Sequence, residues 1–517
     1  KAQIEQSHGR TLPQLLNEVA GITINGALNN LGAVQTTYAR GASSGRTLLL
    51  IDGVPVNDPS MINNEYDLNL FSLDQVERIE VLKGAQSTLY GSDAIGGVIN
   101  IITVNPNVAK PFNVKATVLG GNYGYFKGSV QLYGKQDKLT YSARYTRLQN
   151  DGFSSAYDST GKGDFDNDGY WGNGANAQLQ WQATPKLSFK TFLLYSRYKS
   201  DIDAGLFRDE KDYTIDNSGT TAGAGFTYHH DFLTLTGNVQ YSDVSRNYHN
   251  DSGYIVPGTA STKYERNNYF GKTRFVEIYS SIRLGGGFTL LQEADFRQSN
   301  YNQQYANINL MWGPFSYTVP DTSVSQSALY ASLLYASRNN KLNIEAGGRL
   351  NTHSRYGSNA TYTLNPSYAL TERLRLFAPV ATGFKAPSIY QLSNNEALKA
   401  EKSLTYEGGA EYRRTKTAAR VVYFHRDIDN GIDYNNITYN FYNYIQQKVS
   451  GVEAELTVRP IEQLRINANY TYLSGQETVQ NRITNKDTVT YDYLLRRPVH
   501  SLNVSVGVQP FESLFVS

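Results

Sequence analysis

The sequence predicts an all-β protein, a large transmembrane β-barrel preceded by a small α/β domain, from three observations. The chain has 517 residues, too many for one ordinary globular core, so several domains or one large closed barrel is expected. It contains 40 Tyr and 21 Phe, yet its mean hydropathy is negative, as expected when half of each strand faces a wet barrel interior. From about residue 111 onward, hydrophobic and polar residues alternate.

The composition also excludes several classes of protein. No run of about 18 apolar residues occurs, so no transmembrane helix is expected. The 48 basic and 46 acidic residues are mixed along the chain, so the sequence shows no basic cluster of the kind that binds nucleic acid. Nucleophile-elbow, Walker, HExxH and CxxC motifs are missing, so we expect no enzyme. The absence of cysteine fits a chain that passes through an oxidising compartment without needing disulfides. The first residue, Lys1, and the lack of a visible signal peptide fit a secreted precursor trimmed before this numbering.

The first hundred residues predict a small α/β domain. Residues 11–19 read as a short helix with Thr11 as N-cap and Pro13 in its first turn. The rest alternates short apolar strands and polar connections: strands at 21–24 and 47–51, a tight turn at Asp52-Gly53, and polar loops at 25–37, 58–66 and 85–93.

Residues 74–104 predict a strand, a Gly turn, a loop of small and hydroxyl residues, a second Gly turn and another strand. Glu77, Arg78 and Glu80 place charges on the first of these strands, so one side of it should face charged or polar groups. An ordinary α+β domain could carry one Gly-rich turn, but a run of this length and composition is much more specific.

The rest of the chain predicts the barrel. In residues 464–472 an apolar series from Leu464 to Tyr472 alternates with a polar series that includes Arg465. A soluble sandwich would alternate in the same way, but the connections favour a barrel because short turns at one end face long polar connections at the other. The short turns are at 135–138, 183–186, 229–232, 284–287, 338–341, 370–373, 414–416, 459–463 and 509–513. They imply about eighteen complete strands, with a nineteenth beginning near Ser517.

The 74–104 stretch, and YGSDAIGGVINIIT (residues 90–103) within it, resembles the plug signature of TonB-dependent outer-membrane transporters, and is most similar to the cobalamin-transporter branch. Three later segments resemble barrel landmarks of this family: GFKAPSIYQL (383–392), LKAEKS (398–403) and RRPVHSLN (496–503). Two residues depart from the family pattern: Ala39 stands where Ile or Val is usual, and Ala400 where Pro is usual.

The resemblance implies a plug domain over residues 1–106 that sits inside the lumen of a barrel formed by residues 107–517. The family barrel has about 22 antiparallel strands, so we expect the natural chain to continue beyond Ser517. A barrel left open at that point would expose an unpaired strand edge to lipid.

By the same resemblance, the function is high-affinity active import of cobalamin or other corrinoids across the outer membrane of a Gram-negative bacterium. TonB of the TonB-ExbB-ExbD complex would supply the energy, through a TonB box expected upstream of Lys1. Outer-membrane lipid and lipopolysaccharide, and a surface-exposed corrinoid-binding lipoprotein acting as a lid, are further expected partners. Two alternatives stay open: another cargo, namely a ferric siderophore, haem or a glycan, and a passive porin or adhesion barrel.

The resemblance places the tips of the polar plug loops at the floor of the ligand site. The candidate ligand-binding residues are Asn29, Asn30, Asn63, Asn64, Tyr66, Gln86, Ser87 and Tyr90. Solvated loops of a small domain are the alternative. Glu77, Arg78 and Glu80 are candidates for charge contacts between plug and barrel, with Arg465, Glu453 or Glu455 as partners, or else they face trapped water.

The loop at 157–174 predicts a calcium site. Asp164, Asp166 and Asp168, followed by Gly169, match the first half of a calcium loop, but Ala175 stands where an EF-hand needs Glu. Asp201 and Asp203 in the next acidic loop could supply the missing oxygens, and in cobalamin transporters the corresponding loops bind calcium. A solvated acidic loop is the alternative.

Overall fold

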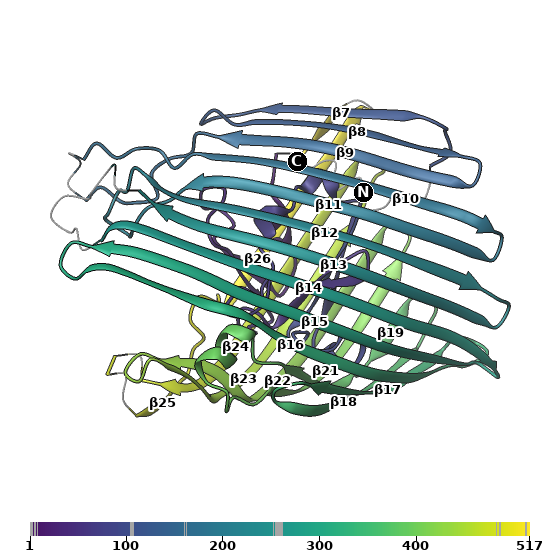
Figure 1. Cartoon of the computed structure of the whole chain (residues 1–517). Coiled ribbons are helices and arrows are strands. Elements are labelled where there is room, and N and C mark those ends of the chain that lie inside the picture. The colour runs from purple at the N-terminus through teal and green to yellow at the C-terminus, as the bar shows by residue number, and fades with distance from the viewer. Residues whose placement is uncertain are drawn as a thin grey trace.

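A computed structural model describes residues 4, 7, 9–103, 108–159, 161, 163–251, 253, 262–481, 483–484, 487–511 and 514–517. The strands from residue 113 onward close into one barrel, and the N-terminal domain, drawn in purple, lies inside it (Figure 1). This arrangement confirms the predicted fold class. The predicted domain boundary, at residues 106 and 107, lies outside the described residues.

The barrel wall consists of antiparallel neighbours in chain order, and the paired strands lengthen toward the middle of the wall. Its strands are β7 (Asn113–Gly120), β8 (Phe126–Gln136), β9 (Leu139–Asn150), β10 (Tyr170–Thr184), β11 (Leu187–Asp201), β12 (Tyr213–His229), β13 (Leu233–Asn250), β14 (Thr262–Gly285), β15 (Phe288–Asn309), β16 (Gly313–Ala336), β17 (Leu342–His353), β18 (Gly357–Ala369), β19 (Leu374–Phe377), β20 (Val380–Lys385), β21 (Glu401–Arg414), β22 (Thr417–Asn435), β23 (Asn440–Val458), β24 (Leu464–Gln480), β25 (Thr488–Tyr491), β26 (His500–Phe511) and β27 (Leu514–Val516).

Each of the nine short turns predicted from the sequence joins two consecutive strands of the wall. Residues 512–513 of the ninth turn lie outside the described residues. Two strands of the wall are interrupted: β19 and β20 both pair with β21, and β25 and β26 both pair with β24. Pro379 explains the first interruption because it has no N–H to donate to the ladder. Counted with each interrupted pair as one, the described part of the wall has the predicted eighteen strands and the start of a nineteenth, β27.

The N-terminal domain, called the plug from here on, contains two sheets. Strands β1 (Ile22–Asn25) and β2 (Thr36–Ala39) form one, and the other has the order β4-β3-β6-β5. The remaining elements are β3 (Thr47–Ile51), β4 (Val54–Val56), β5 (Arg78–Lys83), β6 (Gly97–Ile102), α2 (Leu12–Leu16), α3 (Ser87–Tyr90) and two 3₁₀ turns, η1 (Leu68–Leu70) and η2 (Leu73–Gln75). No helix among the described residues is long and apolar enough to cross a bilayer.

Local sequence explains the first plug elements. Thr11 caps α2 in a reciprocal arrangement with Gln14, as expected for a Thr N-cap. The Asp52-Gly53 pair turns β3 into β4 with φ of 51° and 87°, a conformation that Asp and Gly tolerate. The loop predicted at 85–93 contains the short helix α3, a difference that periodicity over four residues could not reveal.

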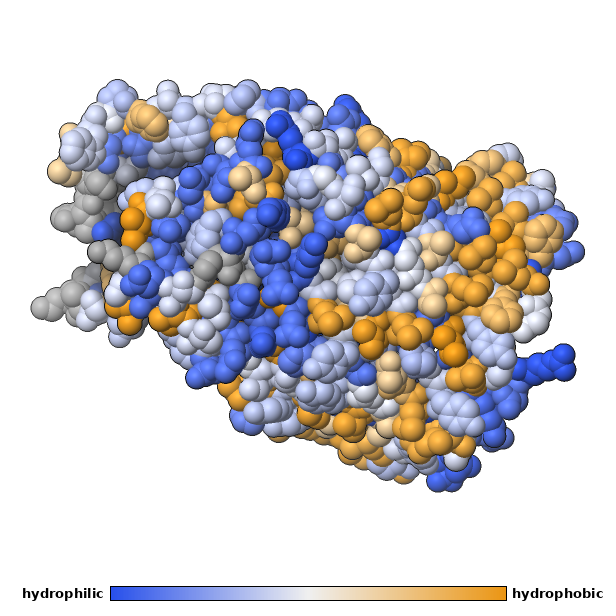
Figure 2. Space-filling view, turned by 90° about the horizontal axis from the view of Figure 1, so that it is seen from below, coloured by the Kyte–Doolittle hydropathy of each residue, from blue (hydrophilic) through white to orange (hydrophobic). Residues whose placement is uncertain are grey.

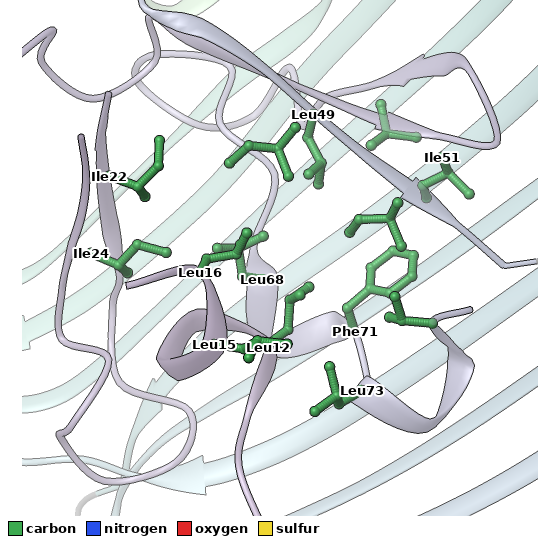
Figure 3. Packing of buried hydrophobic residues seen from close by; sticks show 14 of the residues in the cluster. Leu12, Leu15, Leu16, Ile22, Ile24, Leu49, Ile51, Leu68, Phe71 and Leu73 are labelled. Atoms are coloured by element: carbon green, nitrogen blue, oxygen red, sulfur yellow. The ribbon is translucent and has the colours of Figure 1, made fainter. Parts of the chain in front are cut away.

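The plug has its own hydrophobic core. Leu12 and Leu16 of α2 pack with Ile22 and Ile24 of β1 and with residues of β3, η1 and η2 (Figure 3). Leu12 and Leu16 are fully buried. The plug is therefore a folded unit seated in the barrel, and the charged residues at its surface are available to contact the wall.

The outer face of the barrel carries the apolar series of the strands. Hydrophobic side chains gather on the part of the barrel near the short turns, and hydrophilic side chains dominate the part with the long connections (Figure 2). On β24, Arg465 donates to Asn467 on the inner face, as predicted. Val504 of β26 is 60% exposed on the outer face, and Ser505 accepts a hydrogen bond from Asn467 on the inner face.

These two neighbours give a matched test of the membrane face. We expect Val504→Lys to lower the free energy of unfolding in lipid bilayers by about 2–4 kcal/mol, because it places a charge in hydrocarbon. Ser505→Lys should cost much less, because its charge faces the wet lumen. Equilibrium denaturant titrations in vesicles measure both, and equal losses in the two variants would contradict this assignment of faces.

Candidate functional site

The plug is joined to the barrel by buried ion pairs centred on Arg40. Its guanidinium donates to both carboxylate oxygens of Glu453, at 2.9 and 3.0 Å, and lies 2.7 Å from Glu407. Lys83 at the end of β5 contacts Glu453 at 3.1 Å and Glu455 at 2.9 Å. We call these five residues the latch. The Arg40 side chain is only 1% exposed and that of Glu453 is 0% exposed, so the central pair is out of water.

The backbone around the latch is built for close approach. Arg40 leaves β2 with φ of 48° and packs its guanidinium over the Phe424 ring, 4.6 Å from the centroid. A Cβ at Gly21 would collide with Glu453, and one at Gly84 would collide with Glu407. Both glycines have positive φ, so glycine is favoured there on two counts. The barrel carboxylates therefore reach the plug backbone itself.

Four further ion pairs surround the plug. Each joins a plug residue to a different barrel strand: Arg46–Glu401 at 2.6 Å, Asp58–Arg246 at 3.0 Å, Asp74–Lys127 at 2.8 Å and Asp93–Lys385 at 3.7 Å. All of these side chains are less than 10% exposed. Breaking one such pair by removing a single partner typically costs about 3–5 kcal/mol, because it leaves a buried charge alone.

The contacts predicted for β5 are partly wrong. Arg78 pairs with Glu80 at 2.6 Å within the plug, and Glu80 also accepts from Asn100 of β6. Both are exposed enough to stay hydrated, so these two charges satisfy each other and form no ion pair with the described part of the wall. Glu77 lines a cavity together with Arg144 of β9. Glu453 and Glu455 are partners as predicted, but of Arg40 and Lys83.

Helix α3 is also held by the wall, which corrects one predicted ligand residue, Ser87. The Ser87 hydroxyl is fully buried, donates to the Phe384 carbonyl and accepts from its N–H. Tyr90 packs against the buried cluster of Leu48, Leu50, Ala94 and Val98. Arg349 of β17 donates to the Leu89 carbonyl at 3.3 Å. Ser87 therefore positions the plug, and its burial leaves no surface for a ligand, whereas Tyr90 is half-buried and stays a candidate.

The other candidates divide between the plug core and the face toward the long loops. Tyr66 packs against two buried clusters and is edge-on to Phe71. Asn63 and Arg46 line a cavity of about 260 Å³ between the plug and strands β20 to β24. Asn64 lines two neighbouring small cavities. Asn29 is exposed, and Gln86 begins α3 and is half-buried. Asn63 and Asn64 are thus the predicted residues best placed to meet a ligand.

An aromatic wall that the sequence analysis missed lies on the inner face of β13 to β16. Tyr305 stacks on Tyr317 at 5.1 Å between centroids, and Phe315 is 61% exposed beside them. The aromatic wall is completed by Tyr248, Tyr269 and Tyr301, and Tyr390 and Phe441 adjoin it.

The aromatic wall carries neutral hydrogen-bonding groups. Gln303 donates to Tyr317 at 3.1 Å and to Asn267 at 2.8 Å, and accepts from Tyr301 at 2.7 Å. Arg246 lies over the Tyr269 ring but is already paired with Asp58. Alternation alone could have put these tyrosines on one face of β15, but only the closed register shows that the face is the inner one.

The two acidic loops meet above the plug. The Asp168 carboxylate accepts from the Ser155 N–H at 2.5 Å, and Asp203 accepts from the Ala156 N–H at 2.5 Å. Asp209, which the sequence analysis did not select, accepts from the Asp166 N–H at 3.2 Å. Asp201 lies against Gly169. Asp164, by contrast, is fully exposed and pairs with Lys211, away from the other carboxylates.

Crowding of these carboxylates changes their acidity. Burial, opposed by hydrogen bonds from Ser155 and reinforced by Asp203, raises the pKa of Asp168 to about 6. Burial and the charges of Asp166 and Asp203 raise the pKa of Asp209 to about 6, and burial, with Asp212 and Asp203, raises that of Glu210 to about 7. Ionised together, these groups repel one another, so the loops concentrate negative charge at one place on the rim.

The chemistry of the acidic loops fits a hard cation such as calcium. Asp166 Oδ1, Asp209 Oδ2 and Glu210 Oε1 are buried and make no hydrogen bond. Within the described residues, however, no three His, Cys, Asp or Glu side chains are already gathered around one metal position. An ion would therefore have to draw these oxygens together, as a flexible calcium loop allows.

One predicted ligand residue connects the plug to these loops. The Asn30 side-chain amide donates to the Phe153 carbonyl and, at 3.4 Å, to the Ser155 hydroxyl. Ser155 in turn contacts Asp168. The plug loop and the acidic loop are thus in direct hydrogen-bonded contact.

Comparison with solved structures identifies the fold. The ferric yersiniabactin uptake receptor FyuA of Yersinia pestis superposes with a TM-score of 0.77 at 18% identity, covering 98% of this chain and 82% of that one. A mutant of the ferric enterobactin receptor PfeA of Pseudomonas aeruginosa gives 0.73 at 21% identity, with 98% and 89% covered. The siderophore receptor PirA of the same species gives 0.69 at 21% identity, with 98% and 91% covered.

Sequence comparison identifies the family. Vitamin B12 transporter BtuB of Photobacterium profundum is 26% identical over 420 residues, which are 79% of this chain and 62% of that protein. The chain thus spans less than two thirds of this relative. Residues 1–98 match the TonB-dependent receptor plug domain model, and residues 191–514 match the TonB dependent receptor-like β-barrel model. The chain therefore belongs to the TonB-dependent receptor family, outer-membrane β-barrels that are not enzymes.

Proposed function

We propose that this protein imports a cargo across the outer membrane in a step that TonB energises. The latch is the observation that supports the proposal most directly. Buried ion pairs hold the plug on all sides, so no cargo can cross the lumen until some of these pairs break. The free energy needed to break them has to come from outside the barrel, and in this family TonB is the expected source. A passive pore would have no use for such a closure.

We further propose that the cargo is cobalamin or another corrinoid. The vestibule is the space above the plug between the aromatic wall and the plug loop residues Asn63 and Asn64. It combines stacked aromatic rings with side-chain amides, which suits a large, flat ligand rich in amide groups. The vitamin B12 transporter among the relatives supports this choice. Asn63, Asn64, Tyr317 and Phe315 are the residues we expect at the ligand surface.

A ferric siderophore is the second candidate, because the solved structures of similar fold include siderophore receptors. Iron chelates of that kind are usually anionic and favour basic residues at their site. Of the basic residues there, Arg246 and Lys385 are already paired with Asp58 and Asp93, and Arg297, which lines a small cavity with Asn64, lies over the Phe275 ring. The neutral hydrogen-bonding groups of the aromatic wall therefore favour the corrinoid.

We propose that the acidic loops bind calcium. Asp166, Asp168, Asp201, Asp203 and Asp209 would hold the ion through carboxylate oxygens. Bound calcium would neutralise their mutual repulsion and order the extracellular face. Because Asn30 and Ser155 connect the plug to these loops, an ordered loop would also fix one edge of the vestibule. TonB, lipopolysaccharide and a lipoprotein lid are the partners proposed for the whole protein.

Growth on limiting nutrient tests the cargo. A cobalamin auxotroph that lacks its own outer-membrane transporter should grow on limiting cobalamin when it expresses this protein, and should stop growing when TonB is deleted. Phe315→Ala with Tyr317→Ala should raise the cobalamin concentration needed for growth roughly tenfold, because stacked rings contribute directly to binding. Growth that depends instead on a ferric chelate would select the siderophore candidate.

Conductance tests the latch. In planar bilayers the wild-type protein should stay closed, whereas Arg40→Met should show transient openings. The substitution removes the shared cation of Glu407 and Glu453 and should weaken plug seating by about 3 kcal/mol or more. Arg78→Met is the matched control, since the ion pair of Arg78 lies within the plug, and it should remain closed. If Arg40→Met is as silent as the control, the latch does not hold the plug.

Calorimetry tests calcium. Calcium should bind the wild-type protein and the Asp164→Ala control, and should fail to bind the Asp166→Ala/Asp168→Ala variant. Lowering the pH from about 7.5 to about 5 should weaken binding, because protons then compete for carboxylates whose pKa values are raised to about 6. Identical isotherms for the double variant and wild type would leave a solvated acidic loop as the better description.

A further inference from the structure

Arg426 of β22 is a buried cation with few partners. Its side chain points inward, and the residue is 1% exposed. One guanidinium nitrogen donates to the Arg40 carbonyl at 2.9 Å, and its Nε is buried without a hydrogen-bond partner. Within the described residues no carboxylate forms an ion pair with it. A buried, unpaired guanidinium is costly, so its presence beside the latch requires an explanation.

The charges around Arg426 are unfavourable while the plug is seated. Arg40, Arg46 and Arg497 repel its guanidinium, and Glu407 is the carboxylate that attracts it most. Arg40 occupies Glu407, however, and Arg46 occupies Glu401. The plug thus brings two cations into the lumen and takes up the carboxylates that Arg426 could otherwise use.

The strand register places Glu407 within reach of Arg426. On the ladder between β21 and β22, Arg426 lies opposite Thr405 and Phe424 lies opposite Glu407. Arg426 and Glu407 are therefore diagonal neighbours on the same inner face. Diagonal neighbours are about 7–8 Å apart, a distance that a long side chain spans. A change of rotamer is enough to bring the guanidinium to the carboxylate once Arg40 has left.

We propose that Arg426 is the barrel's own replacement partner for Glu407, taking over this carboxylate when Arg40 is pulled away with the plug. The inference rests on the proposed function, in which the plug must leave its seat. Arg426 is a positioning residue, since it acts through the latch and touches no cargo. Its effect has a definite sign: it raises the free energy of the seated state, through repulsion by Arg40, and lowers that of the released state, through Glu407.

A residue that interacts differently with two states shifts the equilibrium between them. Without Arg426, release of Arg40 would leave Glu407 facing the lumen with no cation beside it. With Arg426, one strong pair is exchanged for another, and the barrier falls. The same exchange reverses when the plug returns, so Glu407 has a cation beside it in both states.

Single-molecule pulling tests this exchange without cargo and without TonB. The full-length protein is held in a lipid bilayer and pulled from its N-terminal end, and the lifetime of the step that releases Arg40 is measured at constant force. Arg426→Met should lengthen this lifetime roughly tenfold. Arg426→Lys keeps the charge and should restore much of the wild-type lifetime. Unchanged mobility of the unheated barrel on gels confirms that each variant is folded.

The opposite result is equally clear. If Arg426 only holds the plug through its hydrogen bond to the Arg40 carbonyl, Arg426→Met will shorten the lifetime, and the proposal fails. A double variant isolates the partner: with Glu407→Gln already present, Arg426→Met should lengthen the lifetime much less, because only the repulsion by Arg40 is then removed. Lengthening as large as in the wild-type background would assign the whole effect to repulsion and would overturn the exchange. None of these results depends on which cargo is imported. The assignment of the cargo and the exchange of partners at Glu407 can therefore be contradicted independently.

Discussion

The structure depends on one electrostatic constraint: charged groups of the plug and of the inner barrel wall are out of water and neutralise one another. Glu453 is completely buried and is shared by Arg40 and Lys83. Neither side could be buried alone, because an isolated ion in a poorly hydrated interior is strongly disfavoured. The buried charges of the wall therefore require the plug in its place, and those of the plug require the wall. The glutamates approach Gly21 and Gly84 so closely that a Cβ at either glycine would collide with them.

This arrangement suits a closure that has to open. A plug seated by apolar contacts would expose a large hydrophobic surface to the lumen on release, whereas charged groups regain water as they separate. The plug keeps most of its apolar residues in its own core, with Leu70 packed against Tyr198 of the wall, and it presents buried charges to the wall. The paired charges buried between plug and wall are stable until one partner is displaced, and the charge left behind is then buried alone. The plug is therefore held firmly until an outside force displaces one of these partners.

Much of the fold could be predicted from the sequence, because its signals are local. The nine turns, the helix capped by Thr11 and the inward position of Arg465 follow from residues within one or two turns of each other. The latch could not be predicted in the same way. Arg78 and Arg40 are both arginines in or beside plug strands, and only the register of β21 and β23 against the plug decides that Arg40 meets Glu453. Ser87 was misassigned for the same reason: a polar loop gives no sign of which part of the wall covers it.

The proposed role of the vestibule is to bind cargo, whereas the latch holds the plug, and the two use different chemical groups. In the proposed function cargo binds reversibly, and the vestibule offers it neutral groups with modest individual energies: stacked rings such as Tyr305 and Tyr317, and amides such as Gln303. The acidic loops at the rim instead concentrate like charges that cannot all ionise comfortably, as the raised pKa values of Asp168 and Glu210 indicate. A rim of this kind is ordered only when something neutralises it. Because Asn30 carries that order to the plug through Ser155, the outer loops and the closure below them form one connected structure.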